Sequence, residues 1–237
     1  MTAIILLVAV ALLQPPQEVS LHTITAEDGH ALPLRYYQPQ FRGTPTVVVV
    51  HDWGGSLERW TDIAERLRGF GFAVVLFNLR GHGGATRAYY FFTDPQIGEM
   101  ADDIALVLRF ARERSDGALH ILGAGLGANL AIVAAAADGA VDKVVAVSPG
   151  LNYRGVTVGE RITELPPERL LLIASREDLY SAHSVAELMQ LFPASQEGMP
   201  AGQPGRRLYD NVGHGVWILK RLPGAVETIA RWLSESD

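Results

Sequence analysis

Two residues in the second half of the chain could together move a proton. Asp178 ends the stretch LLLIASRED, and His214 lies between two glycines in the stretch VGHG. A histidine changes charge near neutral pH, and a neighbouring carboxylate orients the ring and stabilises its charged form. The alternative interpretations are a helix N-cap for Asp178 and a surface-loop position for His214. We favour an interacting pair for the following reason. A strand-to-helix turn that presents a catalytic nucleophile is expected to be followed along the chain by an acid and then by a histidine.

The glycine-rich stretch LGAGLGAN, residues 122–129, has two possible interpretations. It fits the dinucleotide fingerprint G-x-G-x-x-(G/A), and it also fits the nucleophile elbow G-x-S-x-G with Gly125 at the position of the serine. A dinucleotide site needs an acidic residue about 20 positions later, at the end of the following strand. That strand is expected to end in VSP, and the nearest acid, Asp142, lies at its other end. The elbow is therefore the favoured interpretation, and an NAD-binding protein is the weaker alternative.

Backbone N–H groups near the elbow are candidates for stabilising negative charge on a substrate. The N–H of Leu126 would point into such an oxyanion hole from the start of the following helix. A second N–H would come from Trp53, in the loop HDWGG that follows an earlier apolar run, although Gly54 and Gly55 could instead form a simple tight turn. Because both donors belong to the backbone, a glycine at position 125 would leave them in place.

The elements that must position these residues alternate between strand and helix. Two alternating segments surround the turn sequence EDG, which predicts a hairpin. Short apolar runs typical of strands covered on both faces follow. The predicted strands are residues 19–25, 31–37, 46–50, 73–77, 119–122, 144–147, 170–173 and 207–209. Helical spacing connects them near residues 60–70, 97–108, 126–137, 181–191 and 226–233.

This alternation predicts an α/β fold, with a mostly parallel, doubly wound sheet of about eight strands. The interval between residues 148 and 170 is too short for a separate lid domain. Asp102 and Asp103 are expected on the exposed face of their helix, and His82 is expected to be a turn residue at the end of its strand.

In this order and on these elements, the motifs resemble the α/β-hydrolase superfamily, and specifically its small lidless bacterial esterase-like and dienelactone-hydrolase-like members. The resemblance covers residues 19–233, and its departure is Gly125, where the family has Ser or Cys. It implies His214 as the base, Asp178 as its partner, and a preference for small or medium carboxylic esters or lactones. We also expect Leu151 and Tyr153 to contact the substrate.

Without a serine oxygen, Gly125 cannot form an acyl-enzyme. Three alternatives follow: His214 activates a water at the position of the missing oxygen, the fold is an inactive binding protein, or the Asp–His pair carries out proton transfer that needs no nucleophile. Ser148 and Ser175 end neighbouring strands but are disfavoured as substitutes, because the elbow is what presents its side chain to the base.

The composition argues against several functional classes. With a net charge of -6 and a pI near 5.6, the chain should not attract nucleic acids or acidic membranes. The lack of cysteine excludes disulfides, thiolate nucleophiles and cysteine-based metal sites. No HExxH or P-loop motif is present, so neither a metal nor another cofactor is expected. The expected partner is a small-molecule ester or lactone.

The N-terminus contains an unbroken apolar run at residues 3–13 that ends at the sequence QPP. It is too short to span a bilayer but suits the apolar region of a signal peptide. We therefore expect residues 1–17 to be a signal peptide or an N-terminal appendage, followed by a single domain over residues 18–237. The first interpretation predicts export to the periplasm or beyond the cell, and the second a cytoplasmic protein.

Overall fold

A computed structural model describes residues 19–39, 41–83, 88–192 and 204–235. Its main sheet has eight strands in the order β1-β2-β4-β3-β5-β6-β9-β10, with antiparallel pairs at β1/β2 and β2/β4 and parallel pairs elsewhere. The strands are β1 (Val19–Thr25), β2 (Ala31–Tyr37), β3 (Thr46–Val50), β4 (Ala73–Phe77), β5 (Leu119–Ala124), β6 (Lys143–Val147), β9 (Leu170–Ser175) and β10 (Gly205–Tyr209). The prediction of a mostly parallel sheet of about eight strands is confirmed.

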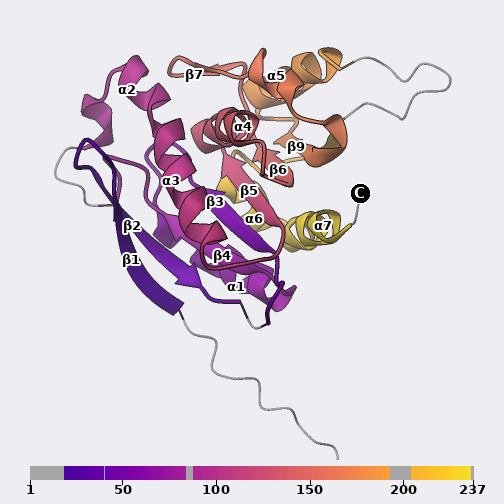
Figure 1. The fold of residues 1–237 in the computed structure, drawn as a ribbon. Coiled ribbons are helices and arrows are strands. Elements are labelled where there is room, and N and C mark those ends of the chain that lie inside the picture. Colours follow the sequence, from indigo (N-terminus) through magenta and orange to yellow (C-terminus); the bar gives the residue numbers. More distant parts are fainter. Residues whose placement is uncertain (1–18, 40, 84–87, 193–203, 236–237) are drawn as a thin grey trace, which may run out of the picture.

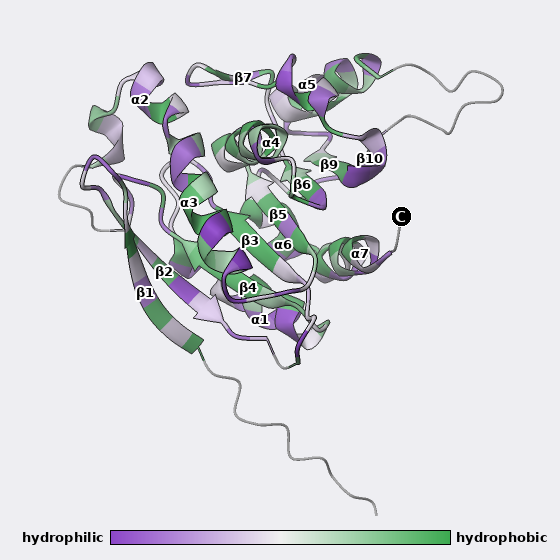
Figure 2. Cartoon of the chain, in the orientation of Figure 1, coloured by the Kyte–Doolittle hydropathy of each residue, from purple (hydrophilic) through white to green (hydrophobic). Residues whose placement is uncertain are grey.

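Helices cover both faces of this sheet, as Figure 1 shows. One face packs against α3 (Met100–Arg112), α4 (Leu126–Asp138) and α5 (Leu179–Gln190), and the other against α1 (Thr61–Gly69), α6 (Val216–Arg221) and α7 (Pro223–Ser234). The short helix α2 (Asp94–Gly98) precedes α3, so the single helical segment expected near residues 97–108 is divided in two. The strands between these layers are predominantly hydrophobic in Figure 2.

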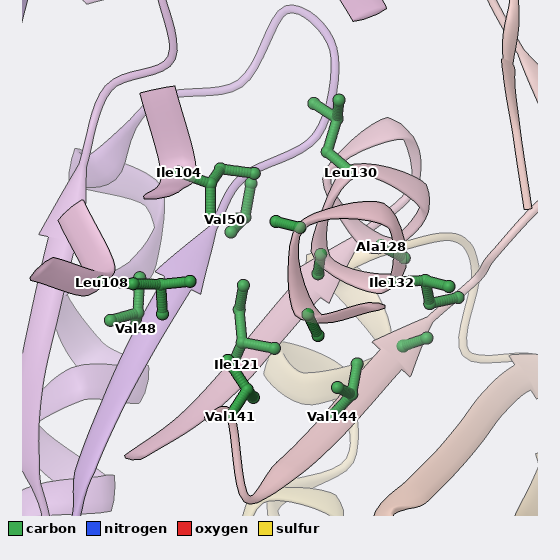
Figure 3. Packing of buried hydrophobic residues seen from close by; sticks show 14 of the residues in the cluster. Val48, Val50, Ile104, Leu108, Ile121, Ala128, Leu130, Ile132, Val141 and Val144 are labelled. Carbon is green, nitrogen blue, oxygen red and sulfur yellow. The ribbon is translucent and has the colours of Figure 1, made fainter. Parts of the chain in front are cut away.

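Complete burial explains why the central strands are apolar throughout. All residues of β3, β4 and β5 are buried. In Figure 3, Val48 and Val50 on β3 face Ile104 and Leu108 on α3. Ile121 on β5 belongs to the same buried cluster. Burying side chains of this kind contributes about 1.5–3 kcal/mol each, before the opposing loss of chain entropy. The buried layers thus fix the strand ends that carry the site.

The segment between β6 and β9 is short, as expected of a chain without a lid domain. It contains a two-stranded hairpin, β7 (Asn152–Tyr153) and β8 (Val156–Thr157), and single turns of 3-10 helix. Asn129 on α4 fastens this segment: its Nδ2 donates to the carbonyls of Gly150 and Val156, and its Oδ1 accepts the N–H of Gly150.

One expectation about polar residues is wrong. Asp103 is buried, because it forms two hydrogen bonds of 2.6 Å with Arg80, which is itself buried; only Asp102 lies on the exposed face. His82 lies in the turn that follows β4, as expected, with its N–H bonded to the carbonyl of Leu79, and its buried ring supports the site.

The predicted signal peptide or appendage at residues 1–17 lies outside the described residues. No helix in the described ranges is long and apolar enough to cross a membrane.

Candidate active site

The turn at Gly125 has the backbone conformation expected of an elbow. Gly125 links β5 to α4 with φ 54° and ψ -123°, a region that favours glycine. The glycines on either side allow close packing: an ideal Cβ on Gly123 would lie 2.2 Å from the carbonyl oxygen of Gly127, and one on Gly127 would lie 2.4 Å from that of His51. The glycine pattern therefore belongs to a tight strand-to-helix turn.

Asp178 and His214, 36 residues apart, are in contact. The Nδ1 of His214 lies 2.6 Å from Oδ2 of Asp178, and the Asp178 Oδ1 also accepts the N–H of Ser181 at 3.4 Å as the N-cap of α5. The two interpretations of Asp178 are thus compatible, since one carboxylate oxygen serves each partner. This contact places the Nε2 of His214 toward the elbow.

The residue that sequence reasoning missed is Asp52, directly after His51 at the end of β3. Its Oδ1 accepts the N–H of Trp53 at 2.7 Å and the N–H of Leu126 at 2.8 Å. Its Oδ2 lies 3.2 Å from Nε2 of His214. The two backbone donors expected to form an oxyanion hole therefore converge on a carboxylate oxygen of the protein itself.

Asp52 fills the volume that a side chain at position 125 would require. An ideal Cβ on Gly125 would lie 2.1 Å from Oδ1, 2.2 Å from Cγ and 2.4 Å from Oδ2 of Asp52. Real Cβ atoms essentially never come this close to other atoms, so a Cβ at position 125 excludes this placement of Asp52. The sequence signal for Asp52 was an acid two residues after the end of a buried strand, in the same loop as the expected backbone donor Trp53.

His214 lies between two carboxylates, and this controls its charge. Burial of the ring favours the neutral form, but the hydrogen bonds that His214 donates to Asp52 and Asp178, and the negative charges of these carboxylates, outweigh burial and raise the pKa of His214 to about 9. At neutral pH His214 is therefore an imidazolium that donates to both carboxylates. The side chains of Asp52 and His214 are 30% and 39% exposed, so solvent reaches this pair.

Two buried neutral histidines hold the loop that carries Asp52. The N–H of Leu79 donates to Nε2 of His51, so His51 carries its proton on Nδ1 and donates to the carbonyl of Asp52 at 2.8 Å. Burial, together with the nearby His82, lowers the pKa of His51 to about 3. His82 acts similarly, because its Nε2 accepts the N–H of Gly54 and its ring stacks on Tyr89.

The loop before His214 is held by Glu177, a second residue that sequence reasoning missed. Its carboxylate accepts the N–H of Gly213 at 2.6 Å, the N–H of Asn211 at 2.8 Å and the hydroxyl of Ser175. The hydrogen bond from Ser175, followed by that from Gly213, lowers the pKa of Glu177 to about 2.

Ser148 and Ser175 are fully buried and are engaged in supporting this loop. The hydroxyl oxygen of Ser148 accepts the N–H of Gly215 at 2.9 Å, and that of Ser175 accepts the N–H of Val212 at 3.3 Å. Neither is placed as a substitute nucleophile.

Tyr153 lies beside the site, with its ring centroid 6.3 Å from that of His214. Burial, opposed by a hydrogen bond with Ser181, raises the pKa of Tyr153 above its ordinary value. Leu151 is partly buried against the core, and its N–H donates to Ser184. The Trp53 ring makes T-shaped contacts with the rings of His82 and Tyr89.

A family model described as Hydrolase_4, serine aminopeptidase, S33, matches residues 43–190, more than half of the chain. The chain belongs to this α/β-hydrolase family. The resemblance stated from the motifs is thereby confirmed at the level of the superfamily. Comparison with curated proteins gave no significant match.

Solved α/β-hydrolase structures share the fold over nearly the whole chain. A lidless α/β serine hydrolase from Xanthomonas campestris is 24% identical with a TM-score of 0.70, over 94% of this chain and 98% of that one. The dienelactone hydrolase of Anabaena variabilis is 18% identical, with a TM-score of 0.65 over 92% and 95%. The esterase Pf2001 of Pyrococcus furiosus is 19% identical, with a TM-score of 0.67 over 92% and 90%. At these low sequence identities, the similarity to the solved structures shows a shared fold and nothing more.

Among the described residues of this α/β-hydrolase, no group of three or more Asp, Glu or His side chains is arranged to hold a metal ion.

Proposed function

We propose that this protein is a small-molecule hydrolase in which the carboxylate of Asp52 takes the place of the elbow serine and works with His214 and Asp178. One observation carries the proposal: Asp52 lies in the volume that a side chain at position 125 would occupy. There its Oδ1 accepts the two backbone N–H groups, and its Oδ2 accepts a hydrogen bond from His214. A carboxylate is a nucleophile in its own right, so it does not need the histidine to remove a proton before it attacks.

The same geometry argues against direct activation of water by His214 in the resting site. The water would have to lie where Asp52 lies, and the imidazolium has no free lone pair with which to accept a proton. Ester hydrolysis by that route would require Asp52 to turn away first. In the proposed function, Asp52 therefore attacks the substrate, and His214 acts on water only afterwards.

Small carboxylic esters and lactones are the first substrates to examine, since the solved neighbours include a dienelactone hydrolase and an esterase. Among esters, those with weakly basic leaving groups suit a carboxylate nucleophile, because an alkoxide is a poorer leaving group than the carboxylate that attacked. 4-Nitrophenyl acetate meets this requirement, and its acyl transfer to Asp52 would give a mixed anhydride that water hydrolyses.

A second candidate, an inactive α/β-hydrolase that serves as a binding protein, has one observation in its favour. Asp52 already satisfies both backbone donors and the Nε2 of His214, so the resting site is internally paired. Such a protein would bind a ligand without converting it.

Hydrolysis of 4-nitrophenyl acetate and of a small lactone, dihydrocoumarin, tests the proposal. Asp52→Asn keeps the shape of the side chain but removes its nucleophilic oxygen, and Asp102→Asn on the exposed face of α3 is the matched control. We expect turnover by the wild type and the control, and roughly a 10²-fold or greater loss in Asp52→Asn. Turnover that is unchanged in Asp52→Asn would contradict the proposal. An absence of turnover on every substrate class would favour the binding protein.

A further inference from the structure

The two oxygens of Asp52 have different environments. Oδ1 is fixed by the N–H groups of Trp53 and Leu126, whereas Oδ2 has one hydrogen-bond partner among the described residues, Nε2 of His214. The side chain is 30% exposed, so a small molecule can approach it. Oδ2 is therefore the atom that attacks, and Oδ1 is the atom that becomes the carbonyl oxygen of any ester formed on Asp52.

This arrangement distinguishes between two kinds of electrophilic carbon. Attack on an acyl carbon creates a new oxyanion on the substrate, but the two donors that would stabilise it are already bonded to Oδ1. The intermediate would also expel the carboxylate more readily than an alkoxide. Attack on a saturated carbon creates no oxyanion on the carbon that is attacked, and it leaves the carbonyl of the new ester in the oxyanion hole. The site is thus organised for the hydrolysis of an ester of Asp52 with an alkyl group.

We infer that the substrates are small alkyl electrophiles, such as alkyl halides or epoxides, which react at a saturated carbon with Oδ2 of Asp52 to form an alkyl ester that water then hydrolyses. This inference rests on the proposed function and narrows its substrate class.

In the first step, Oδ2 donates an electron pair to the carbon, and the bond from that carbon to the leaving group breaks with its electron pair. The negative charge of Asp52 disappears, so His214 loses one of the two carboxylates that raise its pKa and releases its proton. That proton accompanies a departing halide into solvent or neutralises the alkoxide of an opened epoxide. The product of this step is a neutral ester next to a neutral His214.

In the second step, the neutral Nε2 of His214 takes a proton from water as the water oxygen adds to Cγ of Asp52. The developing charge collects on Oδ1, where Trp53 and Leu126 donate. The bond between Cγ and Oδ2 then breaks, and the alcohol leaves with Oδ2 and the proton from His214. The new carboxyl group gives its own proton to His214, which restores the ion pair. Asp52 has exchanged one oxygen with water, and Asp178 has oriented the imidazole throughout.

Gly125 is consistent with this cycle. Water must reach Cγ of Asp52, and Cγ lies only 2.2 Å from the ideal Cβ position of Gly125. The absence of a side chain at the elbow therefore allows the carboxylate both to occupy the site and to be hydrolysed there.

Covalent trapping tests the inference without relying on turnover. His214→Gln removes the base of the second step, so incubation with 1-bromohexane or 1,2-epoxyhexane should add one alkyl group to the peptide that contains Asp52. Hydrolysis of that ester should be roughly 10²–10⁴-fold slower than in the wild type. Asp52→Asn/His214→Gln should acquire no adduct, and His183→Gln, on the exposed face of α5, should behave like the wild type.

A single turnover of the wild type in ¹⁸O-labelled water provides the second measurement. With enzyme in excess over either alkyl electrophile, we expect one ¹⁸O atom in the Asp52 peptide and unlabelled oxygen in the alcohol newly formed from bromohexane. An absence of both adduct and label, with Asp52-dependent hydrolysis of 4-nitrophenyl acetate retained, would overturn the inference and leave the proposed function standing. An absence of adduct, label and ester hydrolysis would overturn both.

Discussion

The carboxylate of Asp52 lies beside Gly125 in the volume that any side chain at position 125 would compete for, since an ideal Cβ on Gly125 would lie 2.1 Å from Oδ1 of Asp52. The glycine at the elbow therefore does more than leave the turn without a side chain. It leaves the space in which an acid from a different loop meets His214 and the two backbone donors. Asp52 can accept these two N–H groups only because position 125 has no side chain.

This competition predicts that Gly125→Ser alone will not produce a serine hydrolase. The serine Cβ would overlap with Asp52, and overpacking of this kind typically costs about 1–3 kcal/mol. Asp52→Gly/Gly125→Ser removes the overlap and frees the oxyanion hole. We expect the double variant to hydrolyse 4-nitrophenyl acetate roughly 10²-fold or more faster than Gly125→Ser, because His214 then has a hydroxyl to activate. Equal rates in the two variants would argue that Asp52 does not block the elbow.

The position of His214 between two carboxylates predicts a pH-dependent stability. The pKa of His214 rises from 6.5 to about 9 on folding, so its ion pairs stabilise the fold fully below pH 6.5 and are lost as the pH rises through 9. The melting temperature of the wild type should exceed that of His214→Gln at pH 6, and the difference should shrink by pH 10. In Asp52→Asn, NMR titration should give a lower pKa for His214 than in the wild type. An unchanged pKa would contradict the ion pair.

Glu177 should influence the site through the loop that carries His214. Glu177→Gln replaces one of the two accepting oxygens with an NH2 group, which cannot accept a backbone N–H. The backbone amides of Asn211 and Gly213 should therefore exchange hydrogen with solvent faster. Because the pKa of Glu177 is lowered to about 2, its stabilising effect is present above pH 4.5 and is lost as the pH falls toward 2. Exchange rates identical to those of the wild type at pH 7 would show that the loop is held by other contacts.

Asn129 should be essential to the order of the segment that contains Leu151 and Tyr153. It is fully buried and makes three hydrogen bonds to the backbone of Gly150 and Val156. Asn129→Ala leaves buried backbone groups without partners, at a cost of about 1–3 kcal/mol for each group that remains unsatisfied. Urea denaturation should show this loss of stability. A loss no larger than about 0.5 kcal/mol, usual for surface substitutions, would mean that the segment is held elsewhere.

The sequence by itself determined the fold and the contact between Asp178 and His214. Strand periodicity and burial are local properties, so apolar runs such as TVVVV and LLLI predicted buried parallel strands correctly. The carboxyl ends of parallel strands meet at one edge of a sheet, which is why the order of Gly125, Asp178 and His214 was sufficient to predict that they lie together.

Only the tertiary structure decided which side chain lies beside Gly125 at the elbow. The contact between Asp52 and His214 joins residues 162 positions apart, and it depends on a side-chain direction that no local pattern encodes. Asp103 shows the same limit, since its pairing with Arg80 across 23 positions, and not its helical periodicity, determines its burial. A loop carboxylate must be hydrated by solvent or hydrogen-bonded to protein donors. Such donors can come from distant parts of the chain, so only the folded structure shows which of the two environments a given carboxylate has.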